Sequence, residues 1–363
     1  MTKLINTQDK RFKNKKIKFV TLFFSFFIIF YLANVIFSNE LDFLFFKINW
    51  FNQSVYSLNY YDYGFIKRGL VATVFNINSS NLTTISTLLG IFIVIIIITL
   101  YIKIILEEKL INNQSYLILF GVSPFFFQYL GYDLGRFDHY GICFMLLTTY
   151  FVITNKNIFI LELMMPFFLL ITEVHFFTST IFFIYIQFIL KRPVRYITLS
   201  FVFTFLIMLI IISVGGMSPE LIKDNINNYA IDIYFNRGAF EGSIYFWKLI
   251  LDFSSTGIYR HLLSIIVYVI SCYWLVFKLN DKKLIFLFLT YFLIFIFGID
   301  HARFLSIFLI NMVFIIIIKQ INFNINFKFP KFKKIFYLII LVGPWGVGKA
   351  MPIITVIKKI IVN

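Results

Sequence analysis

Long apolar runs separated by short polar connections alternate along almost the whole chain. A helix needs roughly 17 to 25 residues to cross about 30 Å of hydrocarbon, and most of the runs approach or reach this length. The pattern predicts an all-α, polytopic membrane protein with a single integral membrane domain over residues 1–363. We expect about eleven transmembrane helices, over 18–37, 84–106, 115–131, 139–154, 157–172, 175–190, 196–214, 262–278, 284–299, 304–319 and 335–348.

Composition supports this interpretation. The chain is 60% hydrophobic and 14% charged, whereas soluble domains are roughly half apolar and a quarter charged. Its net charge of +16 comes from Lys and Arg residues in short clusters between the apolar runs. That pattern is typical of topology signals and argues against nucleic acid as a partner. Both cysteines, Cys143 and Cys272, fall inside apolar runs, which argues against a disulfide framework or a cysteine metal site.

The positions of the basic clusters predict the orientation, because cytoplasmic connections are enriched in Lys and Arg. A strongly basic tail over 1–17 places the N-terminus in the cytoplasm. Because successive spans cross the membrane in alternate directions, all the remaining strongly basic connections then fall on the cytoplasmic side as well. These connections contain Lys103/Lys109, Lys156, Lys191/Arg192/Arg195, Lys278/Lys282/Lys283 and Lys328/Lys331/Lys333/Lys334.

The remaining connections are expected on the extracytoplasmic side. Two of them, 38–83 and 214–261, are long, and we expect short helices within them. The others lie near 131–139, 172–175 and 299–304. All four histidines fall on or at the edge of this side, together with several carboxylates. Ionisable groups near membrane spans are functional candidates. Because these groups gather on the outer side, we expect any functional site to face outward.

The densest group of polar residues lies between Gly131 and Gly141 and contains Asp133, Arg136, Asp138 and His139. A structural interpretation is an internal salt bridge at a helix start, where an acidic residue is stabilising. A functional interpretation makes an aspartate the general base or substrate anchor and the arginine a clamp for an anion, because its rigid five-donor fork suits phosphate.

Three further connections carry candidate residues: Asp62, Lys67 and Arg68; Glu173 and His175; Asp300, His301 and Arg303. Each also has a purely structural explanation. The first group could belong to an aromatic-rich helix on the membrane surface, the second to a polar turn between two helices, and the third to an isolated Asp–Arg pair. If these connections converge with 131–141, they would line an outward cavity suited to an anionic headgroup and a hydroxyl to be activated.

Neither a nucleotide site nor a metal motif is predicted. The run Gly343–Lys349 has the spacing of a phosphate-binding loop, but Ala350 replaces the required Ser or Thr and no strand precedes it. Asp, Glu and His together could ligate a divalent ion, yet no pair has the spacing of a known metal motif. We therefore expect no cofactor and assign no metal ligand, while leaving a divalent metal open.

In its size, apolar spans and two long outer loops, the chain resembles O-antigen and capsule repeat-unit polymerases. Its acidic outer connections, with Asp62, Asp133 and Asp138, also resemble those of the polyprenyl-phosphate-dependent GT-C glycosyltransferases. That family carries essential acids in such loops. An adjacent acidic pair is absent from the first outer loop, although Glu40-x-Asp42 could take its place. The catalytic base therefore stays open between Asp42, Asp62 and Asp133, with Asp138 beside them.

These resemblances imply glycosyl transfer at the outer face of the bacterial inner membrane, with a polyprenyl-(di)phosphate-linked glycan as donor. Surface polysaccharide polymerisation is the first expectation, with membrane lipid and a chain-length regulator as candidate partners. Arg68, Arg136 or Arg303 would stabilise the departing phosphate. The alternatives are a GT-C enzyme that modifies a glycan or lipid, a transporter or flippase for a lipid-linked substrate, and a membrane O-acyltransferase.

Overall fold

The computed structural model describes residues 2–37, 46–63, 65, 68–78, 80–214, 258–297 and 300–323. These residues form helices joined by turns and short connections, and no strand occurs among them. The expected all-α class is therefore confirmed for this part of the chain. A helix satisfies its own backbone hydrogen bonds, which an apolar chain requires wherever it contacts lipid instead of water.

Five of the described helices are long and apolar enough to cross a membrane. They are α1 (Thr2–Phe37), α5 (Leu82–Ile105), α11 (Val194–Val214), α15 (Ile258–Leu279) and α17 (His301–Phe323). The shorter apolar helices are α8 (Asp138–Ile153), α9 (Phe159–Ile171), η2 (Phe176–Thr180) with its continuation α10 (Ile181–Ile189), and α16 (Lys283–Phe297). The chain thus has the character of a membrane protein, whereas the total of eleven spans stays a prediction.

One expected span is not a continuous helix. The segment 115–131 forms two short helices, α6 (Gln114–Gly121), which follows the 3-10 helix η1 (Glu108–Asn113), and α7 (Phe127–Tyr132). The turn between them contains Pro124, whose ring and missing N–H interrupt a helix. The other expected spans before residue 324 coincide with described helices, and 335–348 lies outside the described residues.

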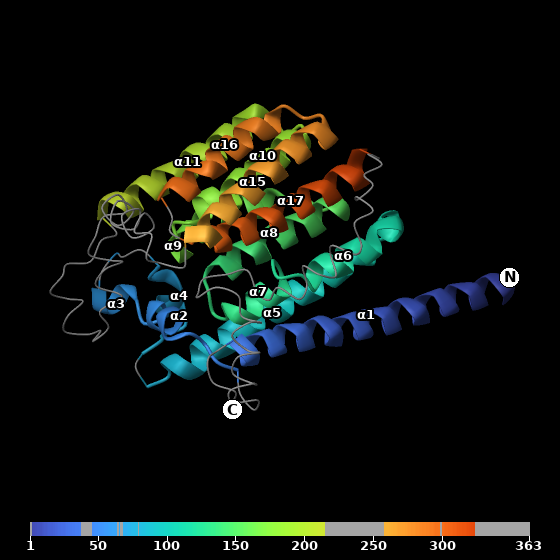
Figure 1. The fold of residues 1–363 in the computed structure, drawn as a ribbon, viewed down its shortest axis with the longest axis horizontal. Helices are drawn as coiled ribbons and strands as arrows, with labels where there is room; N and C mark the ends of the chain where they lie inside the picture. Colours follow the sequence, from blue (N-terminus) through green and yellow to red (C-terminus); the bar gives the residue numbers. More distant parts are fainter. Residues whose placement is uncertain are drawn as a thin grey trace.

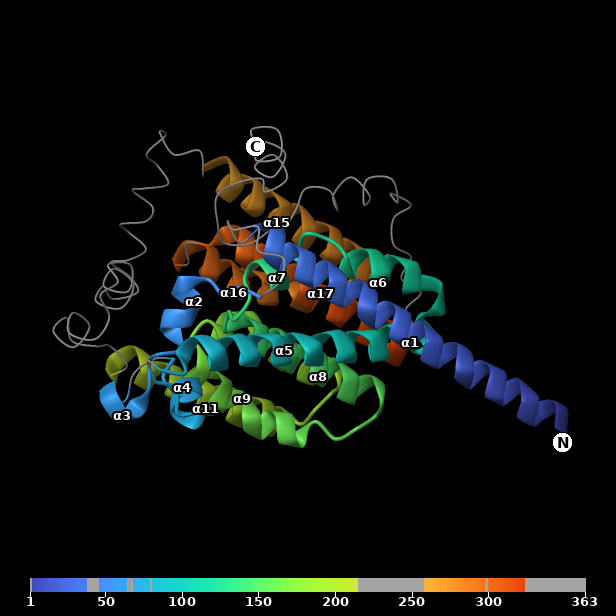
Figure 2. The ribbon, with the colours of Figure 1, turned by 90° about the horizontal axis from the view of Figure 1, so that it is seen from below.

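Successive long helices run in opposite directions, roughly along the long axis of the molecule (Figures 1 and 2). One end carries the short helices α2 (Trp50–Val55), α3 (Tyr60–Tyr63) and α4 (Leu70–Val74). The helices α8 and α17 begin at this end, and α9 ends there. The connections expected on the outer side therefore share one end wherever they are described, although the side of a membrane that this end faces stays a prediction.

The central element is α17. In its apolar segment 89% of the residues are buried inside the protein, against 17% for α11 and 22% for α15. The exposed side chains of α11 and α15 are mostly large and apolar, as a lipid-facing surface requires. Side chains that begin on α17 are thus placed in the interior, surrounded by the other helices.

The far end of α17 is fixed by an ion pair. Lys319 contacts Asp281 in the turn between α15 and α16, and the Tyr185 hydroxyl donates to the same carboxylate oxygen at 2.7 Å. Burial would raise the pKa of Asp281, but the Lys319 ammonium and the Tyr185 hydroxyl hold that pKa below its ordinary value. The carboxylate is therefore ionised at neutral pH and anchors α17 at the end opposite to α2–α4.

Helices α1 and α7 pack at backbone contact. A Cβ on Gly131 of α7 would overlap the Phe30 carbonyl oxygen of α1. The buried Asn34 side chain crosses the same contact, because its Nδ2 donates to the Gly131 carbonyl at 2.9 Å and to the Lys47 carbonyl at 2.7 Å. This close approach sets the position of the polar connection that follows α7.

We predict that Gly131→Ala lowers the thermal midpoint of the purified protein in detergent, with a destabilisation of about 1–3 kcal/mol from overpacking. Its new methyl group meets rigid backbone. Gly121→Ala is the matched control, because its Cβ would meet the Phe26 ring at 2.9 Å, and a side chain can move. Equal midpoints for the two variants would contradict the backbone contact.

Candidate functional site

Two arginines and two aspartates form a closed ring of alternating charge where α8 and α17 begin. Arg136, in the connection before α8, places Nη2 at 3.0 Å from Asp300 Oδ2 and Nε at 3.7 Å from Asp138 Oδ2. Arg303, in the first turn of α17, places Nη1 at 3.3 Å from Asp138 Oδ2 and Nη2 at 3.5 Å from Asp300 Oδ2. We call Arg136, Asp138, Asp300 and Arg303 the charge quartet.

The quartet is almost fully enclosed. Its side chains are between 4% and 14% exposed, and their formal charges cancel. Moving a charge out of water costs several kcal/mol unless partners replace the hydration, so each of these groups depends on the others. Because Arg136 and Asp138 are more than 160 residues from Asp300 and Arg303 in the sequence, the quartet joins two distant segments at one point.

The connection that presents Arg136 is a tight turn. The Arg136 N–H donates to the Asp133 carbonyl at 3.0 Å, and the His139 N–H donates to the Arg136 carbonyl at 3.1 Å. Gly135 lies between them and has a φ of +82°, a backbone conformation that residues other than glycine rarely adopt. A Cβ at this position would also overlap Ile48. The turn therefore requires glycine, and Asp138 follows at the helix start, where a negative charge is favourable.

Asn52 of α2 supports the turn from the other side and was not among the residues that the sequence singled out. Its Nδ2 donates to the Leu134 carbonyl at 3.0 Å, and its Oδ1 accepts from Arg136 Nη1 at 3.3 Å. The side chain is buried. Asn52 thus fixes the direction of the Arg136 guanidinium. Its role could not be predicted from the sequence, because an asparagine in an aromatic-rich loop belongs to no recognisable motif.

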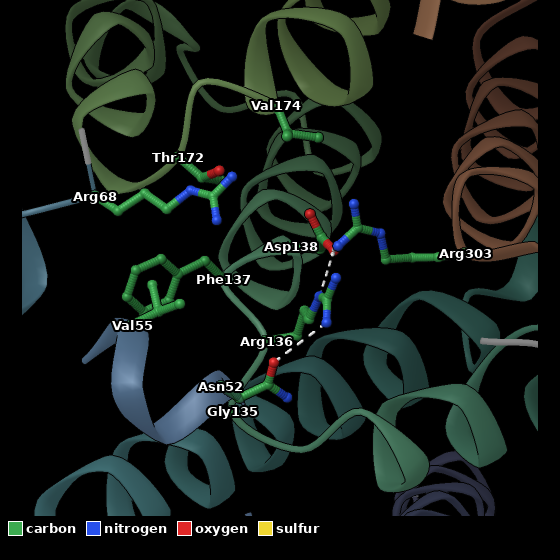
Figure 3. Close-up of a pocket in the computed structure, with 10 residues that line it drawn as sticks. All are labelled: Asn52, Val55, Arg68, Gly135, Arg136, Phe137, Asp138, Thr172, Val174 and Arg303. Carbon is green, nitrogen blue, oxygen red and sulfur yellow. Dashed lines mark hydrogen bonds and ion pairs between the residues drawn. The ribbon is translucent and has the colours of Figure 1, made fainter. Parts of the chain in front are cut away.

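A small pocket with a volume of about 30 Å³ opens beside the quartet and is partly open to the surroundings. Figure 3 shows Arg136, Asp138 and Arg303 on one wall, Arg68 and Thr172 on another, and the apolar side chains of Val55 and Phe137 near Arg68. The pocket leaves room for about one or two water molecules, whereas ligand pockets usually have volumes of roughly 300–1,000 Å³, so a sugar phosphate would have to widen it. The lining offers three guanidinium groups and one carboxylate. Each guanidinium group is paired with a carboxylate, so an anion in the pocket would have to compete for these groups.

Arg68 is held against the pocket by Glu173. Its Nε and Nη2 donate to the two carboxylate oxygens of Glu173 at 3.1 and 2.6 Å, in the bidentate geometry that arginine prefers. Arg68 has a φ of +68°, which is uncommon for a residue other than glycine. The pair joins the segment before α4 to the connection after α9, and both side chains are about one-fifth exposed.

His139 and His175 lie behind the quartet, deep in the bundle. Both are about 1% exposed. His175 packs directly on α8, where a Cβ at Gly141 would lie 2.6 Å from His175 Nδ1 and 2.5 Å from Ser179 Oγ. Both glycines that bound the 131–141 stretch thus permit a close approach of another element.

His301 faces away from the pocket and contacts two helices. Its Nε2 lies 2.9 Å from the Phe295 carbonyl of α16, and its Nδ1 lies 3.2 Å from Nδ1 of His261 on α15. The three candidates at the α17 start therefore divide: Asp300 and Arg303 belong to the quartet, whereas His301 does not.

The remaining candidates lie apart from the pocket or outside the described residues. Asp62 is exposed and accepts from Asn59 Nδ2 at 2.7 Å. Asp133 is buried next to the turn, and its carbonyl accepts from the Arg136 N–H. Lys67 and Asp42 lie outside the described residues. Within the described ranges, no three His, Cys, Asp or Glu side chains gather closely enough to hold a metal ion.

The described residues form a helical bundle with helices that could span a membrane and a charged pocket at one end. Comparisons with family models, with curated proteins and with solved structures found no match. Function is therefore inferred from the pocket itself.

We predict that Asn52→Ala destabilises the protein by about 1–3 kcal/mol, because it leaves buried groups of the turn without their partner. Asn112→Ala serves as the control, since Asn112 in η1 is exposed and lies away from the pocket. The measurement is the thermal midpoint of each purified variant. A midpoint for Asn52→Ala as high as that of the control would show that Asn52 does not support the turn.

Proposed function

We propose that the chain is a membrane glycosyltransferase that takes its sugar from a polyprenyl-(di)phosphate-linked donor, with surface polysaccharide polymerisation as the reaction. The observation that carries the proposal is the pairing of Arg136 and Arg303 with Asp138 in the lining of one small, partly open pocket. Glycosyl transfer from such a donor needs cationic groups for the leaving phosphate and a carboxylate for the attacking hydroxyl, and this pocket contains both kinds of group.

In the proposed step, the hydroxyl oxygen of the acceptor sugar bonds to the anomeric carbon of the donor. The bond between that carbon and the phosphate oxygen breaks, and the (di)phosphate leaves with the bonding electron pair. Asp138 accepts the hydroxyl proton as general base. Arg136 and Arg303 stabilise the charge that develops on the phosphate, as preorganised cations do best in a site with little water.

Asp138 is the strongest candidate for the base among the aspartates that the sequence left open. It lines the pocket, whereas Asp62 is exposed and bonded to Asn59. Asp133 lies behind the turn and does not line the pocket. A general base must reach the proton that it removes, so geometry favours Asp138 over both.

Asp138 would become a better proton acceptor if a bound phosphate replaced it as the partner of the two arginines. While two guanidinium groups contact Asp138 Oδ2, they stabilise the ionised carboxylate and make it a weak proton acceptor. A phosphate in the pocket would draw Arg136 and Arg303 toward its own oxygens. Asp138 would then lose part of its positive surroundings and become more basic at the point where the acceptor hydroxyl must be deprotonated.

The lipid tail of the donor would lie along the apolar outer surface of the bundle. Helices α11 and α15 expose many large apolar side chains, which could contact a polyprenyl chain and membrane lipid alike. The nature of the sugar does not enter this argument, because the pocket residues that carry it recognise phosphate and hydroxyl groups.

We predict that Asp138→Asn reduces product formation by about 10²–10⁴-fold, the usual contribution of a general base. The assay follows transfer from a purified polyprenyl-diphosphate-linked oligosaccharide by the full chain in lipid, at equal amounts of inserted protein. Asp281→Asn is the matched control, since it changes a carboxylate at the opposite end of the bundle.

A large loss in Asp62→Asn with normal activity in Asp138→Asn would contradict the choice of base. If the substrate crosses the membrane without covalent change, the protein is a transporter, and the glycosyltransferase proposal is wrong.

A further inference from the structure

Basic residues gather where α10 ends and where α11 and α16 begin, at the end of the bundle opposite to the charge quartet. Helix α10 packs against both of the other helices. The turn after α10 contains Lys191 and Arg192, the first turn of α11 contains Arg195, and Lys283 is the first residue of α16. Lys191, Arg195 and Lys283 are exposed, and we call these three residues the basic rim.

Aromatic side chains lie beneath the cations of the rim. The Lys283 ammonium is 6.0 Å from the centre of the Phe188 ring of α10, and the Lys191 N–H donates to the Phe188 carbonyl at 3.1 Å. The Arg195 guanidinium is 5.0 Å from the centre of the Tyr196 ring. Both rings are exposed. Two connections that are distant in the sequence therefore bring their charges to one surface around the end of α10.

The neighbouring carboxylates are paired with other cations. Buried Glu162 of α9 accepts two hydrogen bonds from Arg192, each at 3.1 Å. Asp281, which precedes α16, pairs with Lys319. In the described part of the chain, no carboxylate forms an ion pair with the basic rim. An anion from outside the chain could therefore bind the rim without displacing an internal partner.

Lys191 adopts a backbone conformation that favours glycine. Its φ is +53°, and the Arg192 N–H donates to the Gln187 carbonyl at 3.1 Å, so α10 ends in the hydrogen bonds of a Schellman motif. Asn155 after α8 and Asn280 after α15 also have a positive φ, and asparagine tolerates this conformation better than lysine does. A lysine here places an ammonium group at the helix end at a conformational cost. The helix dipole favours a cation at this end.

The helix dipole does not explain Lys283. This residue is at the N-terminus of α16, where a positive charge is unfavourable. Asp281 caps the same helix, because its Oδ1 accepts from the Lys283 N–H at 3.0 Å, but this carboxylate also carries the ion pair to Lys319. An anion beside the Lys283 ammonium would offset the unfavourable charge.

The surface next to the rim is apolar on both flanking helices. Val194 and Leu199 of α11 are exposed, and so are Phe286 and Leu289 of α16. A soluble anion would contact the cations alone, whereas an amphiphile would contact the cations and these apolar side chains together. The arrangement therefore favours a lipid over a free phosphate.

We propose that the basic rim binds the phosphate headgroup of an anionic phospholipid, whose acyl chains lie on the exposed apolar faces of α11 and α16. Clusters of Lys and Arg at helix ends on the cytoplasmic side attract acidic lipid headgroups, and aromatic side chains favour the boundary between lipid and water. The sequence predicts that this end faces the cytoplasm. The site does not depend on the proposed glycosyl transfer, which uses the opposite end of the bundle.

The test uses the full chain, purified in a neutral detergent. Phosphatidylglycerol is titrated into the micelles, with phosphatidylcholine of the same acyl chains and inorganic phosphate in parallel, and the thermal midpoint is recorded at each concentration. We expect phosphatidylglycerol to raise the midpoint above the level reached with the other two, because a ligand that binds the folded state stabilises it. Added salt should weaken the effect, since it screens exposed charges.

The double variant Lys191→Gln/Lys283→Gln should need about 30-fold more phosphatidylglycerol for the same shift, since each lysine near an anionic lipid contributes about fivefold in affinity. Both side chains are exposed, so the midpoint without added lipid should equal that of the wild type. Lys191→Arg/Lys283→Arg retains the charges and should retain the shift. Lys15→Gln/Lys18→Gln is the matched control, because it removes the same charge from exposed positions on α1.

Three results would overturn the proposal. Equal shifts with phosphatidylglycerol and phosphatidylcholine would show that the headgroup charge is not recognised. A phosphatidylglycerol shift that persists unchanged in the folded Lys191→Gln/Lys283→Gln variant would place the lipid elsewhere on the protein. An equal shift with inorganic phosphate would make the rim a site for a soluble anion instead of a lipid.

Discussion

The charge quartet is the interaction on which the outer end of this bundle depends. A buried ion pair gains stability only when its geometry compensates for lost hydration, and removal of one partner leaves a costly unpaired charge. In the quartet the Oδ2 atom of each aspartate contacts both arginines. The ring thereby fixes the start of α8 to the start of α17. It also determines where the pocket between them lies and which charged groups line it.

Small residues and amide side chains let the ring form. Gly131 allows α7 to touch α1, Gly135 permits the turn, and Gly141 admits His175 against α8. Asn52 holds the turn from α2. At the far end of α17, Asp281 and Lys319 make a second anchor. The central helix is therefore fixed by ion pairs at both ends, while its middle is held by apolar packing.

The apolar pattern was sufficient to predict an all-α chain and most of its helix positions, because span length and hydropathy are local properties. It failed at 115–131, where Pro124 divides the expected helix. Of the residues that the sequence considered for one cavity, Arg68, Arg136, Asp138 and Arg303 line the pocket, and Glu173 and Asp300 pair with these arginines. Asp62, His175 and His301 do not line it. Asn52 and the pairing of His261 with His301 could not be predicted, since each depends on contacts between distant segments that leave no local pattern.

The most direct test of the quartet is a double-mutant cycle on Arg136→Ala and Asp300→Ala, with free energies of unfolding measured by denaturant titration in mixed micelles. Side chains that contact each other couple by about 0.5–3 kcal/mol, whereas distant ones add within about 0.5 kcal/mol. A closed ring predicts a coupling of about 1–3 kcal/mol for this pair and additivity for Arg136→Ala with Asp281→Ala. Additive effects for Arg136 and Asp300 would contradict the closed ring.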